Sequence, residues 1–189
     1  QYLRIILDES IRLGRLVDDF LDVSRLEAGA TLLRMERIDT ASLARRVAQT
    51  LGENRAGVKF EVDFEEGLPS PQADPDQIQR AIINLSGNAL KYSPPKGVIR
   101  IRGRRVGDCI EVCVEDQGPG IAQDSQKRLF QKFYRAGDAI SIKTPGTGLG
   151  LYIVKSIMDA HGGSIRLESE VGKGTRVFFT FPIDPPETP

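Results

Sequence analysis

The stretch that decides the fold is residues 74–95, DPDQIQRAIINLSGNALKYSPP. Asp74 is a good helix N-cap, and Pro75 suits the first helical position because an N–H there would have no intrahelical partner. Apolar residues then recur at the three- to four-residue spacing of one helix face, at Ile78, Ile82 and Leu85. Proline at 94 and 95 stops the helix. The stretch therefore predicts an amphipathic helix from about residue 75 to about residue 92.

On the N-terminal side of this helix, two strands and a further helix are predicted. Residues 31–37 have the character of a short strand. Asp39 or Thr40 can cap a helix that carries apolar residues on one face: Leu43, Val47 and Leu51. Val58–Phe64 alternates apolar and charged residues, as a half-buried strand does.

On the C-terminal side, Val98–Arg104 and Cys109–Glu115 are predicted to form a hairpin, because a tight Gly107-Asp108 turn joins them. Residues 122–148 predict a short helix followed by a long, polar, glycine-bearing loop. A loop of that length is usually functional or disordered.

The last elements complete an α+β pattern. A helix over Leu149–Ala160 ends at His161 and two glycines, and Ser164–Ser169 with Thr175–Phe181 form a final hairpin before a proline-rich tail at 182–189. The order predicts a mixed sheet covered by helices on one face. It lacks the strict strand–helix alternation of a Rossmann sheet, so that fold is disfavoured.

A long amphipathic helix is predicted at the N-terminus, over residues 3–24. Its apolar residues follow the 3-4 spacing of a helix that packs on other helices, at Leu3, Ile6, Leu13, Val17 and Phe20. Further apolar positions widen the stripe: Leu16, Leu21, Val23 and Leu26. Such a stripe favours a helical bundle or hairpin that breaks at Gly29. The alternative is a helix docked on its own globular domain.

The composition is that of an ordinary soluble domain. Lys and Arg together number 26 and so do Asp and Glu, which gives no overall field to attract nucleic acid or an anionic membrane. There is no apolar run of membrane-spanning length and no signal-peptide pattern. Cys109 and Cys113 lie four apart in a predicted strand, about 13 Å between Cα atoms, so they are expected to be free, buried thiols.

Asn84 and Asn88 are four residues apart and share one face of the predicted helix, with Lys91 three further on. A carboxamide oxygen is a hard, neutral ligand that suits Mg²⁺, and a lysine can neutralise phosphate charge. Tyr92 adds an aromatic surface that could pack on a base. Taken alone, these residues favour the alternative of a simple solvated polar face.

Two glycine-rich stretches follow. Asp116 precedes Gly118 and Gly120, and glycines remove side chains where a flat ligand must approach. A carboxylate only accepts hydrogen bonds, so Asp116 suits the exocyclic amine of adenine. Residues 146–151, GTGLGL, open a predicted helix whose N-terminal amides favour an anion. An ordinary strand-exit turn and a flexible helix start are the structural alternatives.

In this order, the three stretches resemble the N-box and the two glycine boxes of sensor histidine kinases, within the wider group that includes gyrase and mismatch-repair ATPases. Phe130–Arg135 resembles the phenylalanine box that opens the nucleotide lid, and Asp22–Glu27 resembles the end of the second helix of the dimerisation and phosphoacceptor domain. His161 with its glycines, and Val171–Thr175, match the family's usual closing segments. The resemblance spans nearly the whole chain.

The resemblance implies a two-layer α/β sandwich that binds ATP·Mg²⁺. It implies that Asn88 is the main Mg²⁺ ligand, supported by Asn84, and that Lys91 reaches phosphate. Tyr92 would flank the adenine, and Asp116 would accept a hydrogen bond from the adenine amine.

The remaining residues implied to bind nucleotide lie in the two glycine boxes: Gly118, Gly120, Ile121, Gly146, Thr147, Gly148, Leu149 and Gly150. The glycines of the second box would form the phosphate-side hinge of the lid. Arg135, which ends the phenylalanine box, is expected to contact the γ-phosphate.

One departure from the family pattern has a functional consequence. The phosphoacceptor motif, a histidine followed by Glu and then Arg-Thr-Pro, is absent, and the single histidine, His161, lies at a helix end without an adjacent acid. The expected domains are therefore 1–29, the truncated second helix of the dimerisation hairpin, 30–183, the ATP-binding catalytic domain, and 184–189, a tail. Such a chain should bind ATP but not phosphorylate itself.

Three functions remain to be distinguished. The leading hypothesis is a protein-histidine kinase domain that donates the γ-phosphoryl to a histidine absent from this chain, for relay to the receiver domain of a response regulator. A gyrase-type hydrolase would have a Glu base where Asn84 stands, and a catalytically silent nucleotide-binding scaffold is the third. The expected parent is a cytoplasmic homodimer through the helical hairpin, anchored in a membrane or not. Neither nucleic acid nor membrane contact is expected of this chain.

Overall fold

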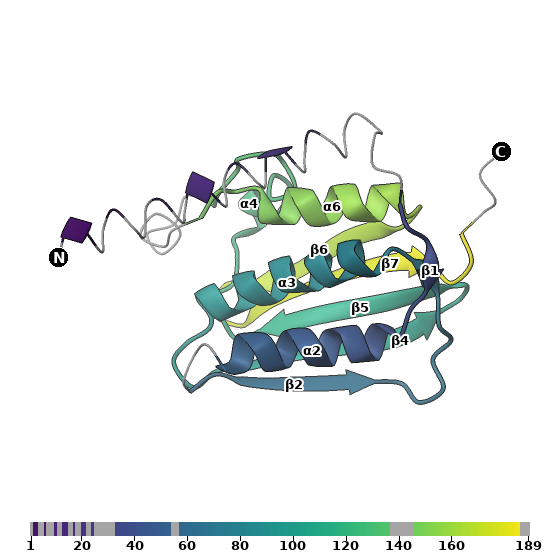
Figure 1. Cartoon of the computed structure of the whole chain (residues 1–189). Helices are drawn as coiled ribbons and strands as arrows, with labels where there is room; N and C mark the ends of the chain where they lie inside the picture. Colours follow the sequence, from purple (N-terminus) through teal and green to yellow (C-terminus); the bar gives the residue numbers. More distant parts are fainter. Residues whose placement is uncertain are drawn as a thin grey trace.

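The structure, a computed structural model, describes residues 33–53, 57–136 and 146–185, together with residues 2, 3, 6, 10, 13, 14, 17, 20, 21 and 24. Its centre is a five-stranded mixed sheet in the order β2-β4-β5-β7-β6 (Figure 1). The strands of this sheet are β2 (Lys59–Phe64), β4 (Val98–Val106), β5 (Cys109–Asp116), β6 (Ser164–Glu170) and β7 (Gly174–Pro182). The helices of this part of the chain are α2 (Thr40–Glu53), α3 (Pro75–Tyr92), α4 (Gln123–Gln126) and α6 (Gly150–Ala160).

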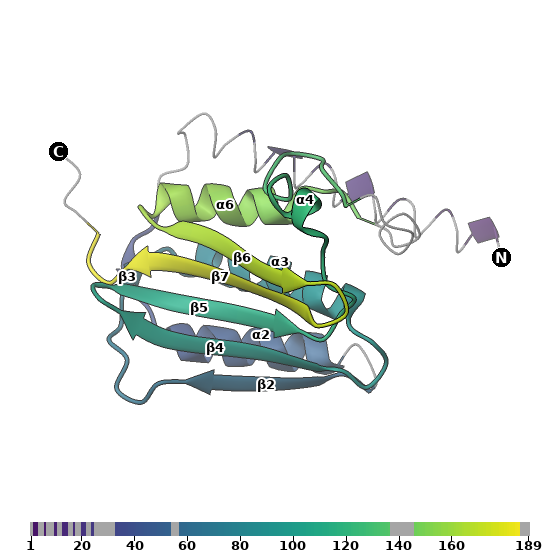
Figure 2. The ribbon, with the colours of Figure 1, turned by 180° about the vertical axis from the view of Figure 1, so that it is seen from behind.

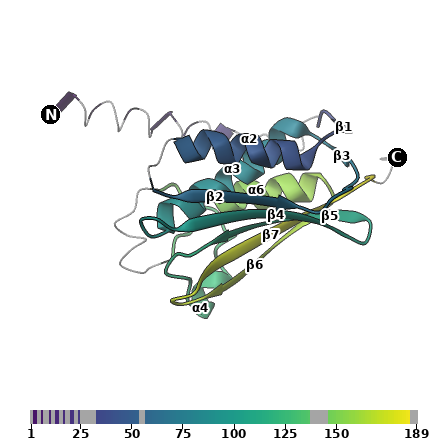
Figure 3. The ribbon, with the colours of Figure 1, turned by 90° about the horizontal axis from the view of Figure 1, so that it is seen from below.

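Three of these helices, α2, α3 and α6, lie side by side on one face of the sheet (Figure 3). The described part of the chain leaves the opposite face open (Figure 2). The core lies between the two layers. Its largest fully buried side chains come from both layers: Ile78, Ile82, Ile99, Ile101, Ile110, Val112, Leu149, Ile153, Ile157, Met158, Phe179 and Phe181. The predicted α+β class, a mixed sheet with helices on one face, is confirmed.

Helix α3 begins and ends as its sequence predicts. The Asp74 carboxylate accepts hydrogen bonds from the backbone N–H groups of Asp76 and Gln77, which have no partner within the helix. Pro75 is its first residue. At the other end the Ser93 N–H donates to the Ala89 carbonyl, and the prolines follow. Both ends are therefore fixed, which matters because α3 carries the carboxamide pair.

The sheet pairing contains two features that the sequence did not reveal. β2 pairs with β4 in parallel, whereas the neighbouring pairs β4–β5, β5–β7 and β6–β7 are antiparallel. A short strand, β3 (Gln72–Ala73), pairs with β1 (Glu36–Arg37). The strand expected over 31–37 is thus only two residues long within the described residues.

The beginning and end of the sheet-and-helix domain meet next to β1 and β3. The Gln72 N–H donates to the Ile183 carbonyl at 2.8 Å, and the Ile183 N–H donates to the Asp108 carbonyl at 2.9 Å. Arg37, at the entry to the domain, forms a 2.6 Å ion pair with Asp184, just after β7. Ile183 and Asp184, which follow β7, are therefore part of the fold, although the sequence predicted a proline-rich tail over residues 182–189.

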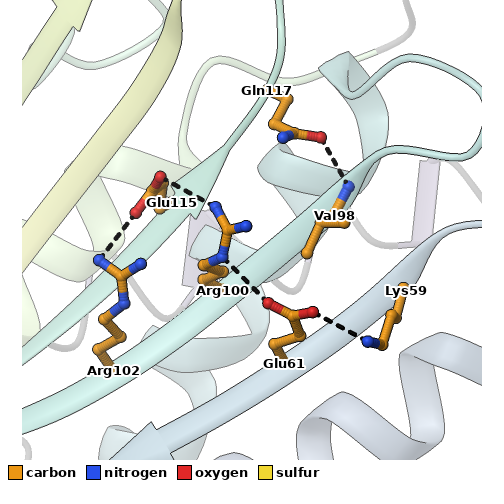
Figure 4. Close-up of polar contacts among 7 residues, drawn as sticks. All are labelled: Lys59, Glu61, Val98, Arg100, Arg102, Glu115 and Gln117. Atoms are coloured by element: carbon orange, nitrogen blue, oxygen red, sulfur yellow. Dashed lines mark hydrogen bonds and ion pairs between the residues drawn. The ribbon is translucent and has the colours of Figure 1, made fainter.

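The open face of the sheet carries a chain of alternating charges that runs across three strands (Figure 4). Glu61 on β2 pairs with Lys59 and with Arg100 on β4, and Arg100 also pairs with Glu115 on β5, which pairs in turn with Arg102. Such partly exposed pairs contribute little to stability one by one. They keep this face hydrophilic and leave the apolar side chains to the helix-covered face.

The described residues near the N-terminus are helical, and their apolar side chains are exposed. Their exposed fractions run from 83% at Leu3 to 46% at Leu21. This exposure disfavours the alternative in which the helix docks on its own domain. Leu16, Val23, Leu26 and the break at Gly29 lie outside the described residues. None of the helices in the described part of the chain has the length and hydropathy needed to cross a bilayer.

The two cysteines are free, as expected. Cys113 is buried and Cys109 is half-buried. Burial, followed by the charge of Glu115, raises the pKa of the Cys113 thiol to about 11, so this thiol is protonated and unreactive near neutral pH.

Replacing Gly87 with alanine is expected to stabilise the protein. Gly87 lies in the interior of α3, and a Cβ built on it meets no atom within 4 Å. Alanine removes the entropic penalty of a helical glycine, so the free energy of unfolding should rise by about 1 kcal/mol, measured by urea denaturation. Gly14→Ala, also in open space but in the N-terminal helix, is the comparison variant. A loss of stability in Gly87→Ala would contradict the open environment.

Candidate functional site

A cavity of about 280 Å³ lies between α3, α6, the ends of β5 and β7, and the segment that follows β5. Twelve of the predicted site residues line it: Asn84, Asn88, Lys91, Tyr92, Asp116, Gly120, Ile121, Arg135, Gly146, Thr147, Gly148 and Gly150. Two others do not. Gly118 is buried, and a Cβ on it would lie 2.7 Å from Asp116 Oδ1 and 3.0 Å from the Tyr92 carbonyl oxygen. Leu149 is 1% exposed in the core, where it precedes α6. Residues from 84 to 150, 66 positions apart in the chain, therefore form one site.

The cavity also has lining residues that the sequence did not predict. Most are apolar: Leu85 and Ala89 on α3, Leu151 on α6, Val114, Leu167 and Val177 on the sheet, and Pro119, Leu129, Tyr134 and Ala136 in the segment after β5. Thr175 on β7 is polar. The strand register explains two of them, because Thr175 is paired with Asp116 and Val177 with Val114. Only the order of strands in the sheet could have identified those two. Leu129 and Tyr134 flank or belong to the phenylalanine box, which was the available signal.

Asp116 is a half-buried carboxylate at the end of β5. One of its oxygens accepts a 2.7 Å hydrogen bond from the Gly118 N–H. Burial raises the pKa of Asp116 to about 6, and the charge of Glu115 adds to this, while hydrogen bonds from the Gly118 and Thr175 backbones oppose it. The carboxylate is thus mostly ionised at neutral pH, yet poorly solvated. A ligand that donates a hydrogen bond to it would relieve that cost.

The loop after Asp116 is held close to the turn between β6 and β7. Gly120 has φ +72°, a region that favours glycine, and a Cβ placed on it would overlap the carbonyl oxygen of Glu170. Gly172 N–H donates to the Pro119 carbonyl at 2.7 Å, and Ile121 N–H donates to the Ser169 hydroxyl at 2.9 Å. The backbone at this side of the cavity is therefore fixed by the sheet.

The two carboxamides of α3 face the N-terminus of α6. Asn84 Nδ2 donates to the Arg80 carbonyl at 3.0 Å, which turns its Oδ1 away from the helix. A Cβ built on Gly150 would lie 3.2 Å from that Oδ1 and 3.6 Å from Asn88 Nδ2. Both side chains and the first residue of α6 thus border the same part of the cavity. The Asn84 carboxamide oxygen thus lies beside a helix N-terminus, which favours anions.

Two cations border the cavity as well. Lys91 is half-buried, and burial lowers the pKa of its ammonium, with the charge of Arg135 lowering it further. The Gly146 backbone is so near that a Cβ there would overlap the Lys91 ammonium, and Arg135 donates to the Gly146 carbonyl at 3.5 Å. Two cations so close together in a partly buried site attract negative charge. They would therefore favour an anionic ligand in the cavity.

The second glycine box adopts the tight geometry expected of a hinge. Gly148 has φ +74°, and a Cβ on it would lie 2.7 Å from the Phe133 carbonyl carbon, so the box is in contact with the phenylalanine box. The Leu149 N–H donates to the Thr147 hydroxyl at 3.2 Å, just before α6 begins. The middle of the loop expected over 122–148 lies outside the described residues.

His161 is not arranged as a phosphate acceptor. It is 4% exposed, Nδ1 lies 2.8 Å from the Ile157 carbonyl, and Nε2 accepts a 3.1 Å hydrogen bond from the Asp74 N–H. An Nε2 that accepts from an N–H carries no proton, so the ring is neutral and Nδ1 is the donor. Burial lowers the pKa of the ring. As predicted, His161 caps the C-terminus of α6.

The donor groups near the cavity do not by themselves form a metal centre. Within the described part of the chain, no three His, Cys, Asp or Glu side chains gather closely enough to hold a metal ion. Two carboxamide oxygens can supply only part of a magnesium shell, so an ion here would need oxygens from a ligand.

The family model of histidine kinase-, DNA gyrase B- and HSP90-like ATPases matches residues 73–185. The chain is 35% identical to the circadian input-output histidine kinase CikA of Synechococcus elongatus, over 99% of the chain and 25% of that protein. Among solved structures, full-length ShkA in complex with AMPPNP superposes with a TM-score of 0.84 at 28% identity, covering 96% of this chain and 38% of ShkA.

A second solved structure, histidine kinase ThkA in complex with response regulator protein TrrA, superposes with a TM-score of 0.78 at 25% identity. It covers 99% of this chain and 52% of the ThkA chain. The chain therefore spans between a quarter and about half of the length of these three similar proteins.

Proposed function

Because the chain belongs to the family of histidine kinase-, DNA gyrase B- and HSP90-like ATPases, we propose that it is the ATP-binding catalytic domain of a two-component sensor histidine kinase. In this role it donates the γ-phosphoryl of ATP to a histidine on a dimerisation domain, for relay to an aspartate of a response regulator. The proposal rests on one observation: around a single cavity, the half-buried Asp116 lies with the Asn84–Asn88 pair and the cations Lys91 and Arg135.

Each part of ATP has a matching group in the cavity. The ionised Asp116 accepts a hydrogen bond from the adenine amine, and the apolar side chains of the sheet, with Tyr92, receive the flat base. The triphosphate supplies the negative charge that Lys91 and Arg135 attract, and the N-terminus of α6 adds its dipole. Phosphoryl transfer depends mainly on such positioning and charge neutralisation.

The residues present fit a magnesium ion that arrives with the nucleotide. Asn88, supported by Asn84, would hold it through carboxamide oxygens. The Oδ1 of Asn84 is available for this role, because its Nδ2 donates to the Arg80 carbonyl and so turns the oxygen toward the cavity. Phosphate oxygens and water would complete the shell. When bound, the ion would draw charge from the phosphates.

Asn84 also favours transfer to a histidine over hydrolysis. A carboxamide cannot take a proton from water, and its nitrogen is engaged with the helix backbone. The buried, neutral His161 cannot receive the phosphoryl group, so the acceptor lies on another chain or on a part of the parent outside this sequence.

We assign the partners and domain limits on the same basis. The exposed 3-4 stripe of the N-terminal helix suits a homodimeric helical bundle, with residues 1–29 as half of the hairpin and 30–183 as the catalytic domain. A response-regulator receiver domain as partner is supported by the ThkA–TrrA complex.

A transfer assay tests this function. The chain is mixed with γ-labelled ATP, Mg²⁺ and a two-helix acceptor domain from a related sensor kinase, whose acceptor His→Gln form is the blank. Acid-labile, alkali-stable label on the acceptor is expected. Asn88→Ala should reduce it at least a hundredfold, whereas Gln79→Ala, an amide truncation on α3 outside the cavity lining, should not. Free phosphate without labelled histidine would instead indicate a hydrolase, and ATP binding without either product a scaffold.

A further inference from the structure

Gln126, the last residue of α4, makes two hydrogen bonds to the backbone beside the cavity. Its Nε2 donates to the Ile121 carbonyl at 2.8 Å and to the Ser169 carbonyl at 2.9 Å. Two carbonyl acceptors fix which end of the amide is the nitrogen. Ile121 belongs to the first glycine box and Ser169 to β6, so one side chain joins three separate segments.

Those segments are already joined to each other, which makes Gln126 a link to a rigid support. Ile121 N–H donates to the Ser169 hydroxyl, and that hydroxyl donates to the Gly174 carbonyl at 2.9 Å. The first glycine box is thus bound to the sheet independently of Gln126, whereas the segment that begins with α4 is tied to both through the Gln126 amide.

The segment that Gln126 anchors forms one wall of the cavity. The Leu129 N–H donates to the Gln126 carbonyl at 3.3 Å, and the Leu129 side chain lines the cavity. Further along, the Arg128 guanidinium lies 4.4 Å from the centre of the Tyr134 ring, which also lines the cavity, next to Arg135. A shift of α4 would thus move three lining side chains together.

We propose that Gln126 is a positioning residue for nucleotide binding: its amide holds α4 against the first glycine box and β6, and so sets the place of the wall that carries Leu129, Tyr134 and Arg135. The proposal rests on the proposed function, because it takes ATP as the ligand of the cavity. A side-chain amide of this length supplies one N–H donor to each of the two carbonyls. A glutamate carboxylate at this position would place an acceptor against the Ile121 and Ser169 carbonyl oxygens, which are acceptors themselves. A leucine would offer these carbonyls no donor.

Binding of ATP·Mg²⁺ to the whole chain, measured by calorimetry, tests the proposal with Gln126→Glu and Gln126→Leu. At pH 8 both variants should bind ATP about tenfold more weakly than wild type. Gln123→Glu, the same change at an exposed position of α4, should bind as wild type does. Melting temperature is recorded for each protein, so that a loss of affinity can be separated from a loss of folded protein.

The pH dependence separates positioning from a general loss of structure. A carboxylate that faces two carbonyl oxygens favours its protonated form, which restores one O–H donor. From pH 8 to pH 5.5, the ratio of the Gln126→Glu dissociation constant to that of wild type should fall from about ten to about three, whereas the Gln126→Leu ratio stays constant. Titration of every other group, Asp116 included, is common to the proteins and cancels in these ratios.

Two results would overturn the inference. One is an ATP affinity of Gln126→Leu or Gln126→Glu within twofold of wild type at pH 8. The other is a Gln126→Glu ratio that does not change with pH. Failure of the wild-type chain itself to bind ATP would refute the proposed function instead, so the two failures are distinguishable.

Discussion

Asp116→Asn is expected to lower the affinity for ATP about a hundredfold at pH 7.5. Hydrogen bonds to a charged acceptor are worth about 1.5–3 kcal/mol, and asparagine replaces one accepting oxygen with a donor that would face the adenine amine or the Thr175 N–H. Glu115→Gln is the matched control, because it makes the same acid-to-amide change one residue away, on the open face of the sheet with Arg100 and Arg102. Equal ATP affinities of Asp116→Asn and wild type, measured by calorimetry, would exclude the assigned contact with adenine.

The raised pKa of Asp116 gives this prediction a second, pH-dependent readout. With a pKa of about 6, roughly a tenth of the carboxyl is ionised at pH 5, so wild-type affinity should fall about tenfold between pH 7.5 and pH 5. Asp116→Asn has no such group and provides the background for titration of ATP itself. A wild-type profile as flat as that of the variant would contradict the requirement for the carboxylate.

The free energy of unfolding should depend on pH through Asp116 in the opposite direction to ATP affinity, falling as the pH rises. The pKa of Asp116 in the folded protein is above the ordinary value of 3.8, so ionising this carboxyl opposes folding. The stability that the protonated carboxyl contributes is therefore lost as the pH rises from about 4 through about 6. At neutral pH, Asp116→Asn should therefore unfold at a higher urea concentration than wild type while binding ATP less well. This is the behaviour of a group retained for binding at the expense of stability.

Gly120→Ala is expected to destabilise the fold by about 3 kcal/mol and to abolish nucleotide binding. Its Cβ would overlap the Glu170 carbonyl oxygen, which belongs to backbone and cannot move alone, and φ +72° is unfavourable for alanine. Relief of the overlap would break the bonds from Gly172 to Pro119 and from Ile121 to Ser169.

Gly107→Ala separates the two causes of the loss of stability in Gly120→Ala, which are the overlap with the Glu170 carbonyl oxygen and the positive φ. Gly107 also has a positive φ, +58°, but a Cβ there meets no atom within 4 Å, so only the torsional cost of about 1 kcal/mol applies. Urea denaturation of both variants gives the difference. Equal losses of stability would show that the close approach of Gly120 to β6 is unimportant.

Local sequence signals predicted the elements of the fold well. Asp74, Pro75 and the following prolines marked α3 to within a residue, and the Gly107-Asp108 turn marked the β4–β5 hairpin, because caps and tight turns are decided by neighbours in the chain. The parallel pairing of β2 with β4 and the short β3 were not predictable in this way. Both depend on contacts between distant residues, and two-residue strands have no periodicity to detect.

The same distinction holds in the cavity. Asn84, Asn88 and Lys91 share a helix face, so their spacing alone predicted that they would lie together. Thr175 lines the cavity only because β7 pairs with β5 in a particular register. Gln126 carries no motif at all, and its contacts follow from the meeting of three segments. Leu149 shows the reverse case, since it lies within a glycine box but its side chain fills the core.

The meeting of the domain's first and last residues has a mechanical consequence. Arg37 and Asp184 are in contact, and Gln72 bonds to Ile183, so tension applied to the chain on either side of the domain would load these contacts one after another. The ion pair and the two-residue pairing of β1 with β3 would give way before the longer pairings of the five-stranded sheet. A pull on the two ends of the domain would therefore disturb this corner of the fold before it disturbs the cavity.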